Sequence, residues 1–489
     1  MAAWLREIVP IVVLLVAVAI VFATLPKIDL GHGPQYLARR RRNWLPLGLT
    51  YAFLYMGRYN LTVSKGAFER LIGADGGVMM GNEAFGVIFG VGTVIYGVSF
   101  VINGPLTDRL GGRFSILLGA FGAAAANLIM GLISWSLWKQ GPGCETFARY
   151  FVPIFSVLYG ANMYFQSFGA VAIVKVNSGW FHVRERGVFG ALFGILISLG
   201  IYFAFDWGGL ILTHFGLAWV FLVPAALLLA FWLIDLSWVR DKPSDAGFPD
   251  IPLGDATDGD TGPRLGPLKV FALMLRNPII VTIACIEFCS GWLRQSIMQW
   301  FRTFASQTDA TLGLASSFVD DHWGMLLCAA GILGGVVAGT ISDHVFGSRR
   351  GPVAALLYAV MLVGAVVMVF TYTQPWVGWL VLVMSLAVIG VHGMLSGTAS
   401  MDFGGSKNAG VAVGLIDGFV YLGTAAMSFT YAVILPQEQL DAAGQLTGPA
   451  TDPANWLAWP LSMVPPAIAG LVLAWRIRGA MPKGKAAAH

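Results

Sequence analysis

Long apolar stretches recur along the whole 489-residue chain, and they limit its fold more than any other feature. Most reach the roughly 20 residues that an α-helix needs to cross the hydrocarbon core of a bilayer. Only 11% of the residues are charged, compared with about 25% in an average soluble domain. The sequence therefore predicts an all-α membrane protein and excludes a soluble enzyme, a disordered chain and a disulfide scaffold. The predicted spans cover residues 8–26, 44–66, 83–106, 114–137, 150–178, 187–211, 214–238, 278–303, 322–345, 352–373, 376–401, 408–435 and 456–477.

Basic residues gather in alternate loops between these spans. A run from Arg39 to Arg42 follows the first span, and 21 of the 30 Lys and Arg residues lie on the same side as this run, against six on the opposite side. Because loops rich in Lys and Arg stay in the cytoplasm, this side is predicted to be cytoplasmic. The C-terminus is then cytoplasmic, the N-terminus lies outside, and we expect the protein in a bacterial inner (plasma) membrane.

The first span, 8–26, is either a cleaved signal peptide or a retained membrane anchor. Its N-terminal flank offers only Arg6, offset by Glu7, and no A-x-A cleavage site follows its apolar core. These features favour a retained anchor, which leaves twelve further spans with both ends in the cytoplasm.

The twelve remaining spans show an internal repeat. A loop rich in Asp, Gly and Pro divides them into six and six. Asp108 and Asp343 are 235 positions apart, and Arg58 and Arg294, in the first spans of the two halves, are 236 apart. Duplicated six-helix halves are typical of transporters, with the substrate site between the repeats near mid-bilayer. We predict an extra N-terminal helix and basic segment at 1–43, six-helix bundles at 44–238 and 278–489, and a cytoplasmic linker at 239–277.

Several motifs resemble a known transporter family. The element Gly104-Pro-Leu-Thr-Asp108-Arg109-Leu-Gly-Gly-Arg113 resembles the signature of the major facilitator superfamily. The resemblance implies the major facilitator fold, two six-helix bundles with pseudo-two-fold symmetry, here with one extra N-terminal transmembrane helix. Other segments resemble the organophosphate:phosphate antiporters within it: Tyr51 to Asn60, Tyr96-Gly97-Val-Ser99, Gly179-Trp180-Phe181 with Arg184-Glu185-Arg186-Gly187, Trp292-Leu293-Arg294, Asp402-Phe403-Gly404 through Gly410, and Tyr421-Leu-Gly423.

Arg58 and Arg294 are the main candidates for substrate binding. An arginine near the middle of a span costs about 2.5–3.5 kcal/mol on insertion scales, so it is expected to face a cavity or a partner. Two guanidinium groups across a central cavity can clamp a phosphate, because each offers paired planar donors. The resemblance implies the same role at these positions. The alternative is a pair of structural arginines held by carboxylates or carbonyls; Glu287 precedes Arg294 by seven positions, on roughly the same helical face.

Further polar residues within the spans are weaker candidates for the same site. Tyr51 and Tyr55 share a helical face with Arg58, and Tyr96 matches a cavity tyrosine of the resembled family; each is either a phosphate ligand or a packing residue. His392 and Asp417 either contact substrate hydroxyls, carry a proton, or are packed and hydrogen-bonded. A polar stretch in the fourth core helix is also predicted to line the cavity, and it comprises Asn162, Tyr164 and Gln166.

Two positions depart from the family pattern. Phe100 stands where the family usually has lysine, and Gly179 aligns with a histidine of the glycerol-phosphate carriers. Lys175 either restores a positive charge to the cavity or extends to the cytoplasmic surface, and its place near the helix end favours the second alternative.

Charged residues at the cytoplasmic helix ends are candidates for gating. The superfamily resemblance implies that Asp108, Arg109 and Arg113 lock the helix ends in one conformation and release them in the other. Asp343 with Arg349 and Arg350 is the second-half counterpart. Pairs of this kind at helix ends form and break at modest cost.

Together, these features predict a secondary transporter that exchanges a phosphorylated small metabolite, of the sugar phosphate or glycerol phosphate class, for inorganic phosphate. The alternatives are a transporter-like sensor of a sugar phosphate and a proton-coupled carrier of another organic anion, with His392, Asp417 and Glu287 as proton carriers. No nucleotide-binding, nucleophile-elbow or H-E-x-x-H motif is present, so we expect no enzyme, cofactor or metal. The expected partners are the substrate, inorganic phosphate and the lipid bilayer, and no nucleic acid is expected. The carrier is expected to be a monomer.

Overall fold

The computed structural model describes residues 31–74, 76–182, 185–250, 267–346, 349–399, 409–441 and 444–479, together with positions 12, 16 and 19. The predicted span at 8–26 therefore lies outside the described residues apart from those three positions. The same is true of the central part of the linker, 251–266, and of the motif residues from Asp402 to Lys407.

Long helices make up almost all of the described chain. The first half contains α2 (Pro34–Phe68), α3 (Asn82–Leu110), α4 (Gly112–Lys139), α5 (Cys144–Arg149), α6 (Phe151–Ser178), α7 (Arg186–Tyr202), the π-helical segment η2 (Phe203–Trp207), α8 (Gly208–Phe215) and α9 (Trp219–Trp238). The second half contains α10 (Pro267–Leu275), α11 (Pro278–Gln307), α12 (Asp309–Leu312), α13 (Phe318–Asp321), α14 (Trp323–Thr340), η4 (Ile341–Val345), α15 (Arg350–Thr371), α16 (Val377–His392), η5 (Gly393–Ala399), α18 (Ala409–Ile434), the strands β1 (Gln439–Leu440) and β2 (Leu446–Thr447), α19 (Ala458–Leu461) and α20 (Val464–Arg476).

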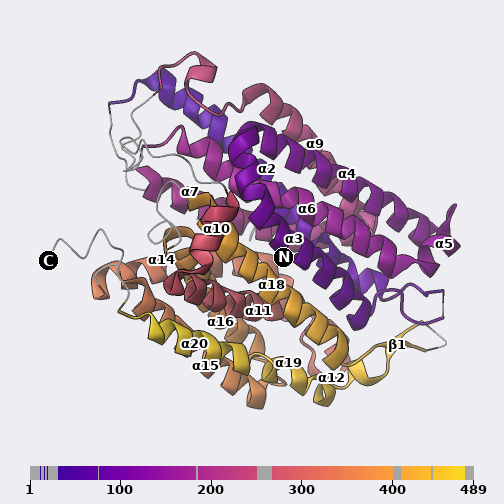
Figure 1. The fold of residues 1–489 in the computed structure, drawn as a ribbon. Coiled ribbons are helices and arrows are strands. Elements are labelled where there is room, and N and C mark those ends of the chain that lie inside the picture. Colours follow the sequence, from indigo (N-terminus) through magenta and orange to yellow (C-terminus); the bar gives the residue numbers. More distant parts are fainter. Residues whose placement is uncertain are drawn as a thin grey trace.

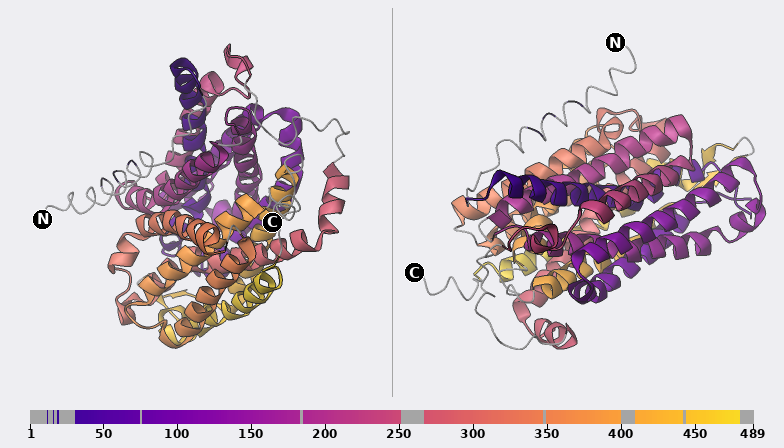
Figure 2. Two further views of the ribbon diagram at one scale, coloured as in Figure 1. Left: turned by 90° about the vertical axis from the view of Figure 1, so that its left-hand side faces the viewer. Right: turned by 90° about the horizontal axis from the view of Figure 1, so that it is seen from above.

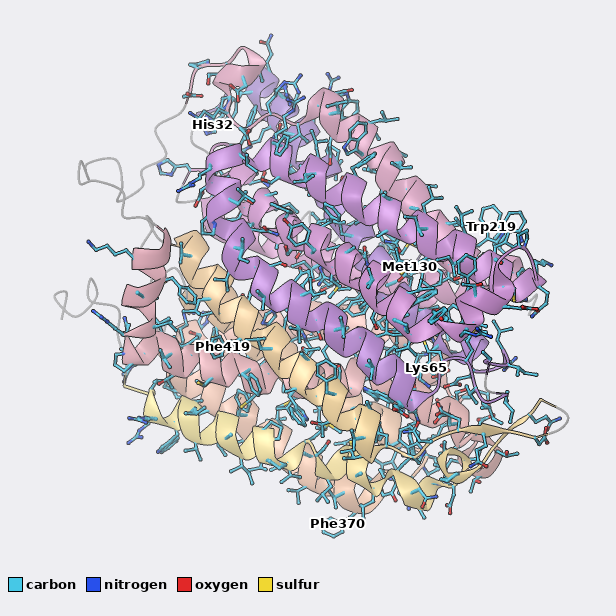
Figure 3. The ribbon with its side chains drawn as sticks, turned by 45° about the vertical axis from the view of Figure 1, so that its right-hand side comes forward. His32, Lys65, Met130, Trp219, Phe370 and Phe419 are labelled. Carbon is cyan, nitrogen blue, oxygen red and sulfur yellow. The ribbon has the colours of Figure 1, made fainter. Side chains whose placement is uncertain are left out.

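The helices are long and apolar enough for a membrane protein. Within the described part of the chain, nine helical segments meet the length and hydropathy needed to cross a bilayer. The helices α2, α11 and α18 are 35, 30 and 26 residues long and run among them, and the first two carry Arg58 and Arg294. Large apolar side chains lie on the outer surface, as contact with lipid requires. Phe370, which points away from the molecule in Figure 3, is 78% exposed.

The helices form two groups that face each other. Figure 1 shows α2 to α9 in indigo to magenta above α11 to α20 in rose-red to yellow. Helices α3 and α18 pack side by side along the boundary, and α7 packs against α14. We call the end with α5 and the β1–β2 pair the hairpin end, and the end with residues 239–250 the linker end; Figure 2 shows the bundle along two further directions.

The first core helix is longer than predicted. It begins at Pro34 and ends at Phe68, so the basic run from Arg39 to Arg42 is a helical extension rather than a separate loop. Proline is well tolerated in the first turn of a helix, because its missing N–H would have no partner there. Lys65 lies in the last turn of this helix and is buried.

Glycines let helices of the two halves approach closely. A Cβ atom placed on Gly97 of α3 would lie 2.9 Å from the Gly418 carbonyl oxygen, and one on Gly418 of α18 would lie 3.1 Å from the Gly97 carbonyl oxygen. Both distances are shorter than ordinary van der Waals contact. Small residues at such crossings are typical of membrane helix packing.

The packing of α11 on α18 also depends on glycine, and it yields a testable prediction. A Cβ atom on Gly291 would overlap the Val420 carbonyl oxygen. We expect Gly291→Ala to cost about 1–3 kcal/mol of stability, because backbone must move to admit the methyl group. The thermal unfolding midpoint of the detergent-purified protein should fall by several degrees. Gly335→Ala is the control, since nothing lies within 4 Å of its Cβ position; equal midpoints for the two variants would contradict the prediction.

Candidate functional site

Arg58 lies at the centre of the molecule and is bound by groups from three other helices. Its side chain comes from α2 and the residue is only 1% exposed. Arg58 Nε donates to Gln166 Oε1 of α6 at 3.0 Å. Its Nη1 donates to the Tyr421 hydroxyl of α18 at 2.8 Å, and its Nη2 donates to the Tyr96 hydroxyl of α3 at 2.7 Å. The guanidinium therefore joins both halves of the molecule.

A polar network on α6 fixes this arginine. Asn162 donates to the Gly57 carbonyl at 2.9 Å, and the Tyr159 hydroxyl donates to the Arg58 carbonyl at 3.0 Å. Gln166 Nε2 donates to Asn162 Oδ1 at 2.9 Å. Because this bond uses the amide N–H of Gln166, its oxygen is left to accept from Arg58. The predicted cavity residues Asn162 and Gln166 are thus brought to Arg58.

The charge of Arg58 is supported by neutral groups. The hydrogen-bond partners given above are an amide and two phenol hydroxyls, so none of them is a carboxylate. The guanidinium carbon also lies 4.5 Å from the ring centres of both Tyr55 and Tyr96. Aromatic faces attract a cation, but they leave its net charge in place. An anion entering here would find an arginine without a counter-ion among these contacts.

Arg294 faces the same tyrosines from the second half. It lies on α11 and is 9% exposed. Its Nε atom has no hydrogen-bond partner among the described residues. Tyr421, Tyr59 and Tyr55 are its main electrostatic neighbours, followed by Glu287. Since Tyr55 and Tyr421 also adjoin Arg58, the structure brings the two predicted arginines to one tyrosine cluster.

The structure places the remaining predicted cavity residues of the first half in different surroundings. Tyr51 is buried and packs edge-on against Tyr55, with ring centres 5.3 Å apart. Tyr164, in contrast, is 37% exposed, so the prediction that it lines the cavity is wrong. It lies two positions from both Asn162 and Gln166, and that spacing turns it to the opposite side of α6. Phe100 stacks on Tyr421 with ring centres 6.0 Å apart.

Four polar side chains of the second half form a separate group, which we call the Glu287 cluster: Glu287, His392, Ser396 and Asp417. The Nδ1 atom of His392 lies 2.8 Å from Glu287 Oε2, and the Ser396 hydroxyl donates to Asp417. His392 and Asp417 are therefore hydrogen-bonded, as one of the sequence alternatives required. The other Glu287 oxygen, Oε1, has no partner among the described residues, and the residue is fully buried.

The predicted gating residues lie at the linker end, and two of them, Asp108 and Arg113, bind partners within the first half. Asp108 Oδ1 accepts from Lys175 Nζ at 2.6 Å, which joins α3 to α6. The Arg113 main-chain N–H donates to Asp241 at 2.8 Å, and its side chain donates to the Leu236 carbonyl at 2.7 Å. Arg109 and Arg349 are exposed, and the Asp343 side chain lies outside the described part of the structure. Lys175 thus lies at the helix end rather than in the cavity.

The Trp180 motif has a structural role at the same end. Arg40 of α2 forms an ion pair with Glu185 at 2.9 Å, and its guanidinium carbon lies 4.5 Å from the Phe181 ring centre. The Trp180 carbonyl accepts from the Tyr36 hydroxyl at 3.1 Å, and its indole N–H donates to the Arg240 carbonyl at 3.0 Å. These contacts tie the helical extension of α2 to the end of α6.

The hairpin end is closed by a buried polar cluster that the sequence did not reveal. We call it the Lys65 cluster; it joins both halves and comprises Lys65, Glu69, Asn82, Gln307 and Glu438. Lys65 pairs with Glu69 and, at 3.0 Å, with Glu438. Gln307 donates to Glu438 at 2.6 Å, and the Asn82 main-chain N–H donates to Glu438 at 2.9 Å. Figure 3 places Lys65 at this end of the bundle.

The two carboxyl groups of the Lys65 cluster differ in proton affinity. Burial raises the pKa of Glu69, against the attraction of Lys65. Burial also acts to raise the pKa of Glu438, but Lys65 and the Asn82 N–H lower it overall. The two shifts therefore run in opposite directions, because a negative charge is better stabilised on Glu438 than on Glu69.

A second contact closes the hairpin end on another side. Both carboxylate oxygens of Asp206, in η2, accept main-chain N–H groups at the start of α14, from Gly324 at 2.7 Å and Met325 at 2.9 Å. Negative charge at a helix N-terminus is stabilising, because the N–H groups there lack partners. The hydrogen bonds between described residues of the two halves thus lie at Arg58 or between it and the hairpin end.

Comparison with known families decides the identity of the fold. The profile of the Major Facilitator Superfamily matches residues 47–428, which covers most of the chain. The chain belongs to the major facilitator superfamily. The predicted all-α major facilitator fold is therefore confirmed, whereas the extra N-terminal transmembrane helix stays a prediction. This superfamily consists of membrane transporters rather than enzymes. Two solved structures show the same fold. A bacterial homolog of the human lysosomal transporter Spinster is 13% identical with a TM-score of 0.61, and the match covers 91% of this chain and 97% of that one. A D-xylose–proton symporter is 16% identical with a TM-score of 0.61, and the match covers 90% of this chain and 98% of that one.

Individual relatives of this facilitator indicate which family within the superfamily it resembles. The membrane sensor protein UhpC of Salmonella typhimurium strain LT2 is 25% identical over 417 residues, covering 82% of this chain and 86% of the relative. The glycerol-3-phosphate transporter of Bacillus subtilis strain 168 is 26% identical over 368 residues, covering 70% of this chain and 76% of the relative. A probable hexose phosphate transport protein of Chlamydia pneumoniae is 23% identical over 407 residues, covering 80% of this chain and 84% of the relative. The predicted resemblance to the organophosphate:phosphate antiporters is thus confirmed.

Proposed function

We propose that this facilitator exchanges a phosphorylated small metabolite for inorganic phosphate across the bacterial inner membrane. One observation carries the proposal: Arg58 is buried between two halves of a transporter fold, among neutral partners, and shares its tyrosines with Arg294. A buried cation of this kind is costly unless an anion binds it. Relatives that are named as glycerol-3-phosphate and hexose phosphate carriers support a phosphoryl group as that anion.

The site residues suggest how the phosphoryl group is held. The two guanidinium groups each offer a planar fork of N–H donors that matches phosphate oxygens. Tyr96 and Tyr421 now accept hydrogen bonds from Arg58 through their hydroxyl oxygens. On binding, these hydroxyls can donate to the same phosphate. Because phosphate and a phosphate ester share this head group, one site serves both.

The contacts between the halves support alternating access. Opening the hairpin end requires the Lys65 cluster and the Asp206 contacts to break, while the linker end must close. The basic loops orient the linker end toward the cytoplasm, with the C-terminus inside. The roles of Asp108, Arg109, Arg113, Asp343 and Arg349 in closing that end remain predictions, as do the domain boundaries and a monomeric carrier.

A sensor of a sugar phosphate is the second candidate function. The membrane sensor protein among the relatives covers as much of this chain as the named carriers do. Phe100, which fills the space beside Tyr421, is the departure in this chain that favours it. A sensor binds its ligand without moving it, so transport measurements separate the two.

The purified protein in phosphate-loaded liposomes provides the test. We expect radiolabelled phosphate to exchange with internal phosphate, and external phosphate esters, but not their non-phosphorylated parents, to accelerate its efflux. Binding of a sugar phosphate without any exchange would contradict the carrier proposal and favour the sensor. Uptake driven by a pH gradient alone, in liposomes without phosphate, would contradict it in favour of proton coupling.

A further inference from the structure

The Glu287 cluster has no role in binding a phosphoryl group. Glu287 is fully buried, with its Oε2 beside His392 and its Oε1 unpartnered among the described residues. Asp417 accepts from Ser396, and its charged neighbours are His392, Glu287 and Arg294. Two carboxylates thus lie next to the arginine that is proposed to bind an anion. Such groups repel a phosphate dianion, so their presence needs another explanation.

The position of the cluster relative to the arginines indicates which part of a substrate it meets. Glu287 precedes Arg294 by seven residues on α11, which is two helical turns, or roughly 10 Å along the axis. Asp417 precedes Tyr421 by four residues on α18, which is about one turn. Both displacements run along the bundle to the linker side of Arg58 and Arg294. A small phosphate ester held by the arginines would extend its organic end over this distance.

The charges of the cluster point to a cationic ligand. Burying a carboxylate is expensive unless a positive charge or several hydrogen-bond donors compensate it. Apart from Arg294, the only cationic group facing the two carboxylates from the described parts of α11, α16, η5 and α18 is His392. His392 is 23% exposed, so it can turn away when a ligand enters.

We propose that Glu287 and Asp417 form a subsite for a protonated amine, so that the carrier prefers phosphate esters that also bear an amino group. This inference rests on the proposed exchange function. His392 contacts Glu287 while the subsite is empty, and the amine of the substrate displaces it on binding. The amine donates to the free oxygen of Glu287 and to Asp417. The two ends of the substrate then match the charges of the two sites.

The first half shows what a neutral site looks like in the same molecule. Around Arg58 the polar groups are phenol hydroxyls and amides, and nearby Asn60, Asn127 and Asn162 are linked by hydrogen bonds. Amides both donate and accept, which suits hydroxyl groups, and they cost less to bury than carboxylates. The second half instead carries two carboxylates, which is the choice expected for an ammonium group.

The matched pair of glucosamine 6-phosphate and glucose 6-phosphate tests the subsite, because the two differ by an ammonium against a hydroxyl group. Each is measured at pH 7 as an inhibitor of phosphate exchange in proteoliposomes. We expect the half-inhibitory concentration of the amine to be about tenfold lower, the effect of one charged hydrogen bond. Glu287→Gln and Asp417→Asn should each bring the ratio of the two concentrations close to one. Glu145→Gln, at an exposed carboxylate outside the bundle, should leave this ratio at its wild-type value.

The ratio within each variant is the readout, so a general loss of transport rate does not affect it. For a variant too slow to assay, the shift of the thermal unfolding midpoint by each compound gives the same comparison. Equal inhibition by the two compounds in the wild type, or a preference that survives both substitutions, would overturn the subsite. Loss of phosphate exchange in the wild type would instead overturn the proposed function itself.

Discussion

Replacing Arg58 with lysine is expected to lower the rate of phosphate exchange by about a hundredfold, although the positive charge is kept. The guanidinium makes three hydrogen bonds to three helices, and a lysine ammonium cannot reproduce this planar arrangement. It also cannot hold two phosphate oxygens with parallel bonds. Arg294→Lys is expected to act in the same direction, because its guanidinium has an Nε donor still free to bind a ligand.

The measurement is initial exchange of radiolabelled phosphate in proteoliposomes, normalised to the reconstituted protein. Thermal unfolding and size-exclusion chromatography show whether Arg58→Lys still folds, since the residue lies at the centre of the molecule. Arg149→Lys, an exposed position, controls for the chemistry of the replacement. Near wild-type exchange by folded variants at both 58 and 294 would exclude the arginine clamp.

The second large effect is expected at the hairpin end. Lys65→Met removes the single cation of the Lys65 cluster and leaves Glu69 and Glu438 buried together. Breaking a buried ion pair in this way costs about 3–5 kcal/mol in the state that contains it. The state with the hairpin end closed is penalised, whereas an open state lets water reach both carboxylates. We therefore expect the conformational equilibrium to shift toward opening of this end.

Labelling of an introduced cysteine measures this shift. Gln299 is fully buried on α11, between Arg294 and the Lys65 cluster, so Gln299→Cys reports access from the hairpin end. In a background without the four native cysteines, a membrane-impermeant thiol reagent added at that side should react at least about tenfold faster in Lys65→Met. Lys139→Met, at an exposed lysine, serves as the control. Unchanged labelling would show that the cluster does not hold the end closed.

Hydropathy predicts the membrane spans, the motif resemblance implies the major facilitator fold, and rare intramembrane charges indicate the centre of the candidate site. Spans follow from long apolar runs, and Arg58 and Arg294 stand out because arginine is costly at those positions. Gln166 was found because polar residues are unusual in the middle of a span. Its orientation toward Arg58, however, depends on the Asn162 side chain, which only the structure supplies.

Other features could not be predicted because they depend on pairing between distant segments. Lys65 and Glu438 are 373 positions apart, and each alone is typical of an external loop. Tyr421 was quoted in a motif but not proposed as a site residue, since nothing local shows that it reaches Arg58. Tyr164 lies among polar neighbours in the sequence, but its helical phase turns it to the opposite side of α6, where it is exposed. Side-chain direction and long-range contact are therefore what the structure adds.

The neutral surroundings of Arg58 affect whether the carrier can change conformation without cargo. If the site must close on both sides before it opens to the other side, an empty site would then enclose an arginine that neither water nor an anion stabilises. That intermediate is costly without cargo and much less so with a phosphoryl group bound. Under the proposed exchange function, return of the empty protein would thereby be suppressed, and each outward movement would be matched by an inward one. Strict stoichiometric coupling would then need no separate device, because the binding group itself enforces it.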